Sequence, residues 1–368
     1  MIRYVRMPIE VESPEEFGYD RILYNLAESS VTDQSLGSLG LQIPDLTLLY
    51  NDHRGSPELR RLIVADSGCD PEDVLVTTGA AAGLFIVATA LLSAQDHIVV
   101  VRPNYATNLE TPKAIGCAIS FIDLAFEDGF KLSIDAVAAA LTPTTKLISV
   151  TCPHNPTGMM LTLDQLNQLA ALARQQGCRL LVDETYRDLS LEPALPLAAS
   201  LGPQVISVSS LSKAYGVPGI RLGWIITTDP ALQELFLAAK EQISISGSVI
   251  DEWVGEQVLH SRSERLPLIL AEMRRRRQLV ADWVAAEDRI EWIAPQGGVV
   301  CFPRIKRISD EGLARFYEVL VQSHGAYVGP GHWFEMSDRH FRLGYGWPSA
   351  EALQGGLTAI SAALDEVV

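Results

Sequence analysis

A single lysine, Lys213, stands among small and hydroxylated residues directly after an apolar run that predicts a buried strand. Burial at such a position lowers the pKa of a lysine ammonium, because a desolvated site disfavours the charged form. A lysine that loses its proton readily can form a Schiff base with a carbonyl group. Ser210 and Arg221 flank it at three residues before and eight after, and such a pair can hold a phosphate. The stretch therefore predicts a nucleophilic lysine beside an anion site.

A carboxylate is expected at the end of another strand. The apolar run 180–182 leads into Asp183, and Tyr186 follows three residues later. Ligands of parallel sheets bind at the carboxyl ends of the strands, so Asp183 can meet a bound group there. A carboxylate keeps a pyridine nitrogen protonated, which makes such a ring an electron sink. A magnesium-binding aspartate is the alternative, but the GxxxxGK[ST] loop that it needs is absent from the sequence.

Two further stretches follow predicted strands. Residues 152–158 hold two prolines and a glycine, which predict a rigid turn around Asn155. Residues 77–83 run through Gly79 into a predicted helix, whose free backbone N–H groups can bind an anion. The glycine spacing differs from GxGxxG, which disfavours a nicotinamide dinucleotide.

These motifs need a scaffold, and the alternating apolar runs and helical periods between about residues 70 and 239 predict one. The expected strands are 74–77, 98–101, 118–122, 147–151, 180–183, 205–208 and 222–227. The expected helices are 80–92, 108–115, 134–141, 163–176 and 231–241. Such alternation predicts an α/β fold whose mostly parallel sheet has helices on both faces.

The pattern changes after about residue 248. A long helix is expected over 267–286, short strands over 299–303 and 341–343, and a last helix over 350–364. We therefore expect a large domain, residues 46–247. A smaller α+β domain would combine residues 1–45 with residues 248–368.

Composition narrows the class of partner. The chain has 368 residues and a net charge of −16, so it lacks the basic footprint that nucleic-acid binding requires. No apolar run reaches the roughly 18–20 residues of a membrane span. Five dispersed cysteines without CxxC spacing indicate reduced thiols rather than disulfides or a metal site. We expect a cytoplasmic protein that binds no nucleic acid, no membrane and no metal.

Taken together, the motifs resemble the class I/II aminotransferases, the fold-type-I enzymes that depend on pyridoxal 5′-phosphate (PLP). The resemblance rests on Asn155-Pro-Thr-Gly, Asp183-x-x-Tyr186, Ser210-x-x-Lys213 and Gly219-x-Arg221, in this order. It extends from about residue 25 to residue 364. It implies the fold-type-I architecture, a homodimer and a small-molecule amino acid substrate. A regulator of this kind would carry an appended basic DNA-binding domain, and the chain has no spare segment for one.

The resemblance also implies roles for single residues around the cofactor ring. Lys213 would carry PLP as a Schiff base and act as acid and base for the α-proton. Asp183 would pair with the ring nitrogen. Asn155 and Tyr186 would flank the phenolic oxygen, and Tyr105 would stack on the ring, although a core tyrosine is equally expected there from its residues alone.

Further contacts are implied at the phosphate and at the substrate. The expected phosphate contacts are Ala80, Ala81, Ser210, Arg221 and Tyr50, the last from the neighbouring subunit. Arg342 would clamp the α-carboxylate of the substrate, near Asn155. No second arginine can be placed for a side-chain carboxylate, so an aspartate-type substrate is not supported.

The N-terminal region also resembles one branch of the family. Residues 25–37, 212–224 and 341–348 are similar to the capreomycidine-synthase branch, which eliminates a hydroxyl group from hydroxyarginine and closes a guanidine ring. Transamination to a keto acid is the expected reaction, and β- or γ-elimination with cyclisation is the alternative. A long or basic substrate side chain is expected, with Glu28 and Asp33 as its acidic neighbours.

Overall fold

The computed structural model describes residues 2–191 and 193–367, and a seven-stranded sheet lies at its centre. The strand order is β2-β8-β7-β6-β5-β3-β4. The strands are β2 (Val74–Thr78), β3 (His97–Arg102), β4 (Ala118–Asp123), β5 (Thr145–Thr151), β6 (Arg179–Asp183), β7 (Val205–Ser210) and β8 (Leu222–Ile226). All seven expected strands are present. The pairings among β3 to β7 are parallel, whereas β8 runs antiparallel to both of its neighbours.

Helices cover both faces of this sheet. Successive side chains of a strand point to opposite sides of the sheet, and both sets are apolar here. In β3, Ile98 and Val100 belong to the core on one face, and Val99 and Val101 belong to the core on the other. Both faces are therefore apolar, as in sheets enclosed between helices. The helices of this domain are α3 (Pro57–Ile63), α4 (Gly79–Leu91), α5 (Ala106–Ile115), α6 (Ile134–Ala140), α7 (Leu163–Gln176) and α8 (Pro230–Ile243).

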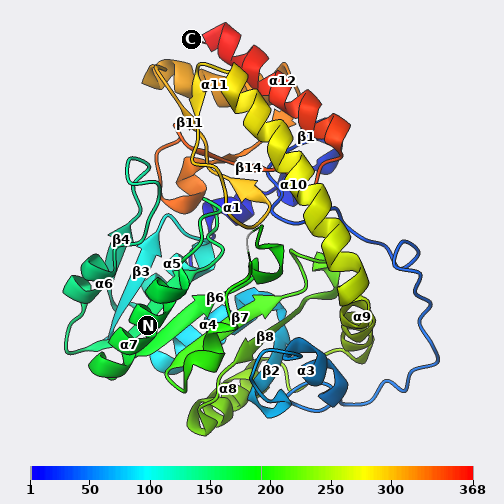
Figure 1. Cartoon of the computed structure of the whole chain (residues 1–368), viewed down its shortest axis with the longest axis vertical. Helices are drawn as coiled ribbons and strands as arrows, with labels where there is room; N and C mark the ends of the chain where they lie inside the picture. The colour runs from blue at the N-terminus through cyan, green and yellow to red at the C-terminus, as the bar shows by residue number, and fades with distance from the viewer. Residues whose placement is uncertain (1, 192, 368) are drawn as a thin grey trace.

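A smaller lobe of short strands and helices lies above the sheet (Figure 1). The long helix α10 (Arg262–Ala286) runs from α9 (Val249–His260) to the C-terminal helix α12 (Ala350–Val367) (Figure 1). The other elements of this lobe are β9 (Ile290–Glu291), β10 (Val300–Cys301), β11 (Arg304–Ile305), α11 (Asp310–Gln322), β12 (Ala326–Tyr327), β13 (Gly329–Pro330) and β14 (Phe341–Gly344). No described helix is long and apolar enough to cross a membrane.

The N-terminal segment contacts both lobes. Its strand β1 (Tyr24–Asn25) pairs in parallel with β12 of the small lobe. Its backbone also bonds to the large lobe, where Val31 N donates to Lys213 O at 2.9 Å and Gln34 N donates to Gly216 O at 2.7 Å. The short helices α1 (Pro8–Val11) and α2 (Pro14–Phe17) precede β1, and α1 lies between the lobes (Figure 1). The segment is therefore placed to roof any cavity at the sheet edge.

Candidate active site

A cavity of about 520 Å³ lies at the carboxyl ends of β5, β6 and β7, under the N-terminal segment. Its lining includes all of the predicted site residues except Tyr50 and Asp33. These residues are Glu28, Ala80, Ala81, Tyr105, Asn155, Asp183, Tyr186, Ser210, Lys213, Arg221 and Arg342. They come from loops far apart in the chain, and the parallel strands bring those loops to one edge.

Lys213 projects from the loop after β7 and is partly buried in this cavity. Its Nζ donates to Ser29 Oγ at 3.1 Å. Desolvation lowers the pKa of the Lys213 ammonium, and the positive charge of Arg342 lowers it further. A lysine in this setting supplies a neutral amine more readily than a solvated lysine does.

Asp183 ends β6, and its carboxylate is buried and held by two neighbours. Oδ1 accepts from Thr185 N at 3.1 Å and from Thr185 Oγ1 at 2.6 Å, while Oδ2 accepts from Asn108 Nδ2 at 3.4 Å. Burial raises the pKa of Asp183, and these hydrogen bonds oppose that rise. The arrangement holds a carboxylate in one orientation at the cavity wall. The sequence analysis did not name Thr185 or Asn108. Asn108 is 75 positions away from Asp183, whereas the local spacing Asp183-x-Thr185 was a signal that could have been used.

The start of α4 forms a cradle for an anion. A Cβ atom on Gly79 would lie 2.5 Å from an Arg221 guanidinium nitrogen, and one on Gly223 would lie 2.5 Å from Ala80 N. Only glycine therefore lets Arg221 and β8 approach the first turn of α4 so closely. Backbone N–H groups in that turn have no partner within the helix. Together with the Arg221 guanidinium, they fit a phosphate group.

Arg342 on β14 brings a buried cation to the opposite side of the cavity. One terminal nitrogen donates to Ala27 O at 2.7 Å and the other to Asn155 Oδ1 at 3.4 Å. Its Nε is buried and has no hydrogen-bond partner among the described residues. A buried donor without an acceptor is costly, and a carboxylate supplied by a ligand would satisfy it.

Tyr186 and Tyr105 line the cavity from two sides. The Tyr186 hydroxyl donates to Ser29 O at 2.8 Å, and burial raises the pKa of this phenol to about 12. The Tyr105 hydroxyl donates to Glu10 at 3.4 Å, and burial raises its pKa to about 12 as well. Both phenols are therefore hydrogen-bond donors at neutral pH.

Apart from Glu28, the residues that roof the cavity were not predicted from the sequence. Glu10, Ser13, Glu15 and Ser29 all line it. The roof is anchored through Glu12, whose Oε2 accepts from His332 Nε2 at 2.8 Å and from Trp333 Nε1 at 2.7 Å. Hydrogen bonding to Asp338 and then to Glu12 raises the pKa of His332 to about 9. The ion pair is therefore complete at neutral pH and is lost as the pH rises through about 9.

Two residues named from the sequence lie outside the cavity. Asp33 is not part of its lining, and it accepts a hydrogen bond from Trp347 Nε1 at 2.8 Å. Tyr50 is 77% exposed on the extended segment between β1 and α3. Within one chain, Tyr50 therefore lies outside the cavity that the other predicted residues line.

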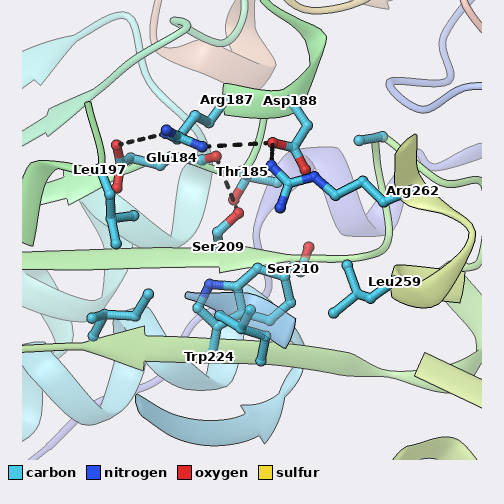
Figure 2. Close-up of a pocket in the computed structure, with 13 residues that line it drawn as sticks. Glu184, Thr185, Arg187, Asp188, Leu197, Ser209, Ser210, Trp224, Leu259 and Arg262 are labelled. Carbon is cyan, nitrogen blue, oxygen red and sulfur yellow. Dashed lines mark hydrogen bonds and ion pairs between the residues drawn. The ribbon is translucent and has the colours of Figure 1, made fainter. Parts of the chain in front are cut away.

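A second, much smaller cavity lies behind the same strands and is lined by Glu184 instead of Asp183. Figure 2 shows the Glu184 carboxylate directed toward Arg187 and Leu197. Burial raises the pKa of Glu184 to about 7. At about 30 Å³ the space can hold little more than a water molecule. Neighbouring carboxylates on β6 and its following loop thus face two different cavities, and only Asp183 faces the large one.

Among residues 2–191 and 193–367, no cluster of three or more His, Cys, Asp or Glu side chains is arranged to hold a metal ion. The large cavity instead combines a lysine, a strand-end carboxylate, an anion cradle and a buried arginine. That combination defines the class of enzymes that bind PLP through a lysine.

Comparison with known proteins agrees with this class. The family described as aminotransferase class I and II matches residues 40–360. Capreomycidine synthase of Streptomyces vinaceus is 31% identical over 92% of this chain and 88% of its own. Arginine–pyruvate transaminase of Pseudomonas aeruginosa is 29% identical over 80% of this chain and 77% of its own.

Solved structures show the same architecture. A PLP-dependent aminotransferase from Streptococcus suis has a TM-score of 0.90 and 26% identity, covering 99% of both chains. The PLP-dependent cyclase OrfR has a TM-score of 0.88 and 27% identity, covering 100% of this chain and 99% of its own. The chain belongs to the class I and II aminotransferase family. It is a PLP-dependent enzyme that acts on an amino acid, and the expected fold class is confirmed.

Proposed function

We propose that the large cavity binds PLP and that the enzyme transfers the amino group of its substrate to a keto acid acceptor. Lys213 would hold the cofactor covalently, and Asp183 would face its ring nitrogen. Tyr105 would lie against the ring, with Asn155 and Tyr186 at its phenolic oxygen. The remaining contacts would hold the phosphate, namely Ala80, Ala81, Ser210 and Arg221. When bound, PLP delocalises the negative charge that remains on Cα after the α-proton leaves.

The residues of this chain would supply orientation and proton transfer. Arg342 would bind the α-carboxylate, because its buried Nε still lacks an acceptor. Lys213 would take the α-proton and later act as the acid that donates a proton, since its lowered pKa suits a group that must be neutral to act as a base. Asp183 would keep the ring nitrogen protonated through charge. The observation that carries the proposal is this pairing of Lys213 and Arg342 across one cavity.

Cyclisation is a second candidate reaction, because capreomycidine synthase and the cyclase OrfR are both among the relatives. The two reactions differ in what becomes of the amino group. The test is to mix purified holoenzyme with single amino acids and hydroxyarginines, without an acceptor, and to follow absorbance and products by mass spectrometry. Transamination is expected to convert the cofactor to pyridoxamine phosphate with one equivalent of keto acid. Repeated turnover with the cofactor still as PLP would show elimination or cyclisation instead.

A homodimer would complete the phosphate site through Tyr50. Leu48, Leu49 and Tyr50 are 74%, 60% and 77% exposed on an extended segment that runs along the outside of the chain (Figure 1). Three consecutive apolar side chains in water are unusual unless a partner covers them. The segment is held firmly at its base, where Asn51 Nδ2 and Ser56 N both donate to Glu252. This anchoring would present Tyr50 to a neighbouring subunit.

Mixing two inactive variants tests this arrangement. Lys213→Ala and Tyr50→Ala homodimers are each expected to have low activity, and subunit exchange between them should restore about one quarter of wild-type activity. The reason is that half of the randomly formed dimers are hybrids, and each hybrid has one site with both residues intact. Activity assays after exchange, with light scattering, measure the effect. No recovery despite proven exchange, or a monomer active at nanomolar concentration, would contradict the proposal.

We also propose a cytoplasmic location. The five cysteines are all unpaired, and four of them are buried. Burial raises the pKa of Cys152 to about 12, so this thiol is unreactive. Free, inert thiols suit a reducing compartment.

A further inference from the structure

The charges that line the large cavity do not balance once the cofactor and an α-amino acid are accounted for. If the proposed function holds, Lys213, Arg221 and Arg342 serve the cofactor and the α-carboxylate, and Asp183 serves the ring nitrogen. Three carboxylates of the lining then remain without a role, and all belong to the N-terminal roof: Glu10, Glu15 and Glu28. None of the three forms a salt bridge with a described residue. The cavity therefore has an acidic side and no spare cation.

Glu28 is the least exposed of the three, since it is partly buried whereas Glu10 and Glu15 are exposed. Its neighbours in the chain touch the two anchors of the substrate, because Ala27 O accepts from Arg342 and Ser29 Oγ accepts from Lys213 Nζ. The Glu28 side chain lines the same cavity as the group that would bind the α-carboxylate and the group that would meet the α-amino end. The positive charges of Lys213 and Arg342 both lower the pKa of Glu28, which places it electrostatically near each of them.

One oxygen of Glu28 is available to a ligand. Tyr19 Oη donates to Oε1 at 3.0 Å, and Asn25 Nδ2 donates to the same oxygen at 3.5 Å. Within the described part of the chain, no hydrogen bond reaches Oε2. Desolvation raises the pKa of Glu28, and the negative charge of Glu15 raises it further. A cation placed against Oε2 would relieve both effects.

The buried, unpaired Nε of Arg342 gives an independent reason to place an amino acid here. Its α-carboxylate would be fixed on the β14 side of the cavity, so its side chain must share the remaining space with Glu28. A second carboxylate on that side chain would meet like charge and would lack a cation, which is a large cost in a partly desolvated site. A neutral side chain would leave Glu28 desolvated and uncompensated.

We propose that the cavity selects amino acids whose side chain ends in a cation, with Glu28 as its direct partner and Glu15 and Glu10 as the outer acidic wall. The inference deepens the proposed function and depends on it. Guanidinium and ammonium groups share the required chemistry. A guanidinium can additionally donate to two acceptors at once, which the spread of three carboxylates would favour.

The experiment measures binding rather than turnover. Holoenzyme whose lysine–cofactor bond has been reduced with borohydride cannot turn over, and calorimetry then gives Kd for L-arginine, L-lysine, L-citrulline and L-glutamate. L-citrulline matches arginine in shape but has a neutral side chain. We expect arginine or lysine to bind about tenfold to a hundredfold more tightly than citrulline, as a charge-assisted hydrogen bond implies. The arginine and lysine arms distinguish a guanidinium from an ammonium.

Two variants locate the effect. Glu28→Gln should reduce the arginine-to-citrulline ratio to near one, whereas Glu16→Gln should keep the wild-type ratio. Glu16 is the matched control, because it adjoins Glu15 in α2 but lies outside the cavity lining and pairs with Arg6. An unchanged ratio in Glu28→Gln would overturn the assignment of Glu28.

Failure of this inference and failure of the proposed function look different. If all four amino acids bind without a preference for charge, or if glutamate binds most tightly, the cationic site is wrong and the amino acid enzyme stands. If the wild-type protein takes up no PLP on Lys213, the proposed function fails first. Should Glu28→Gln not fold, the wild-type ratio alone decides, because a value near one overturns the inference.

Discussion

Replacing Lys213 with alanine is expected to abolish turnover and the visible absorbance of the lysine-bound cofactor together. The variant lacks the amine that would bind PLP covalently, and it also lacks the base for the α-proton. General acid–base catalysis alone contributes about 10²–10⁴-fold, so we expect a loss of at least about 10⁴-fold when both roles disappear. Steady-state assays and absorbance spectra measure the two effects. The fold should persist, because the Lys213 side chain makes only one hydrogen bond to the described residues, with Ser29.

Lys240 provides an internal control for this prediction. It is also a buried lysine whose pKa is lowered by desolvation, but it lies outside the large cavity and donates to His53 O. After borohydride reduction and peptide mapping of the wild type, the cofactor should be found on Lys213 and not on Lys240. This result would show that the cavity, and not a low pKa by itself, directs the reaction. A reducible adduct on any other lysine in the alanine variant would refute the role of Lys213.

The sheet and the residues on its loops could be predicted because the signals are local. Asp183 follows an apolar run that is too short for a helix, and Lys213 follows another. The direction of β8 could also have been predicted from the sequence, because residues 211–221 are fewer than the dozen or more that a parallel crossover needs.

Helix α10 begins at Arg262, ahead of the expected start at Pro267. Pro267 lies inside α10. A proline there removes one hydrogen bond and crowds the carbonyl four residues earlier, but it did not end this helix.

The roof of the site escaped prediction for a different reason. Helices α1 and α2 span four residues each, so they show no period that a sequence pattern could reveal. Glu10 and Glu15 are typical of ordinary surface acids in the sequence. Their segment reaches the sheet edge through long-range contacts, such as the pairing of β1 with β12 and the bonds of Glu12 to His332 and Trp333. Asn108 likewise meets Asp183 across 75 positions of the chain. Such relations depend on tertiary packing, which no local motif encodes.

Asp183→Asn should leave PLP bound but lower kcat by about 10³-fold. The asparagine is isosteric, and Thr185 can still hold its side chain oxygen, so the fold and the cofactor contacts made by other residues should survive. The substitution removes one negative charge beside the ring nitrogen. At 4 Å and an effective dielectric constant of 20, a unit charge pair is worth about 4 kcal/mol. That energy corresponds to roughly 10³-fold in rate if it is lost from the transition state.

Glu184→Gln is the matched control for that substitution, because the residue is adjacent, equally buried and acidic, yet it faces the small cavity behind the strands (Figure 2). With its pKa raised to about 7, Glu184 is partly protonated at neutral pH already, so the amide should change kcat by no more than a few-fold. Steady-state kinetics and the cofactor spectrum of both variants decide the matter. If Asp183→Asn turned over at nearly the wild-type rate, Asp183 would not tune the cofactor. If both variants lost activity equally, the loss would reflect damage to the end of β6, because only the charge of Asp183 faces the ring.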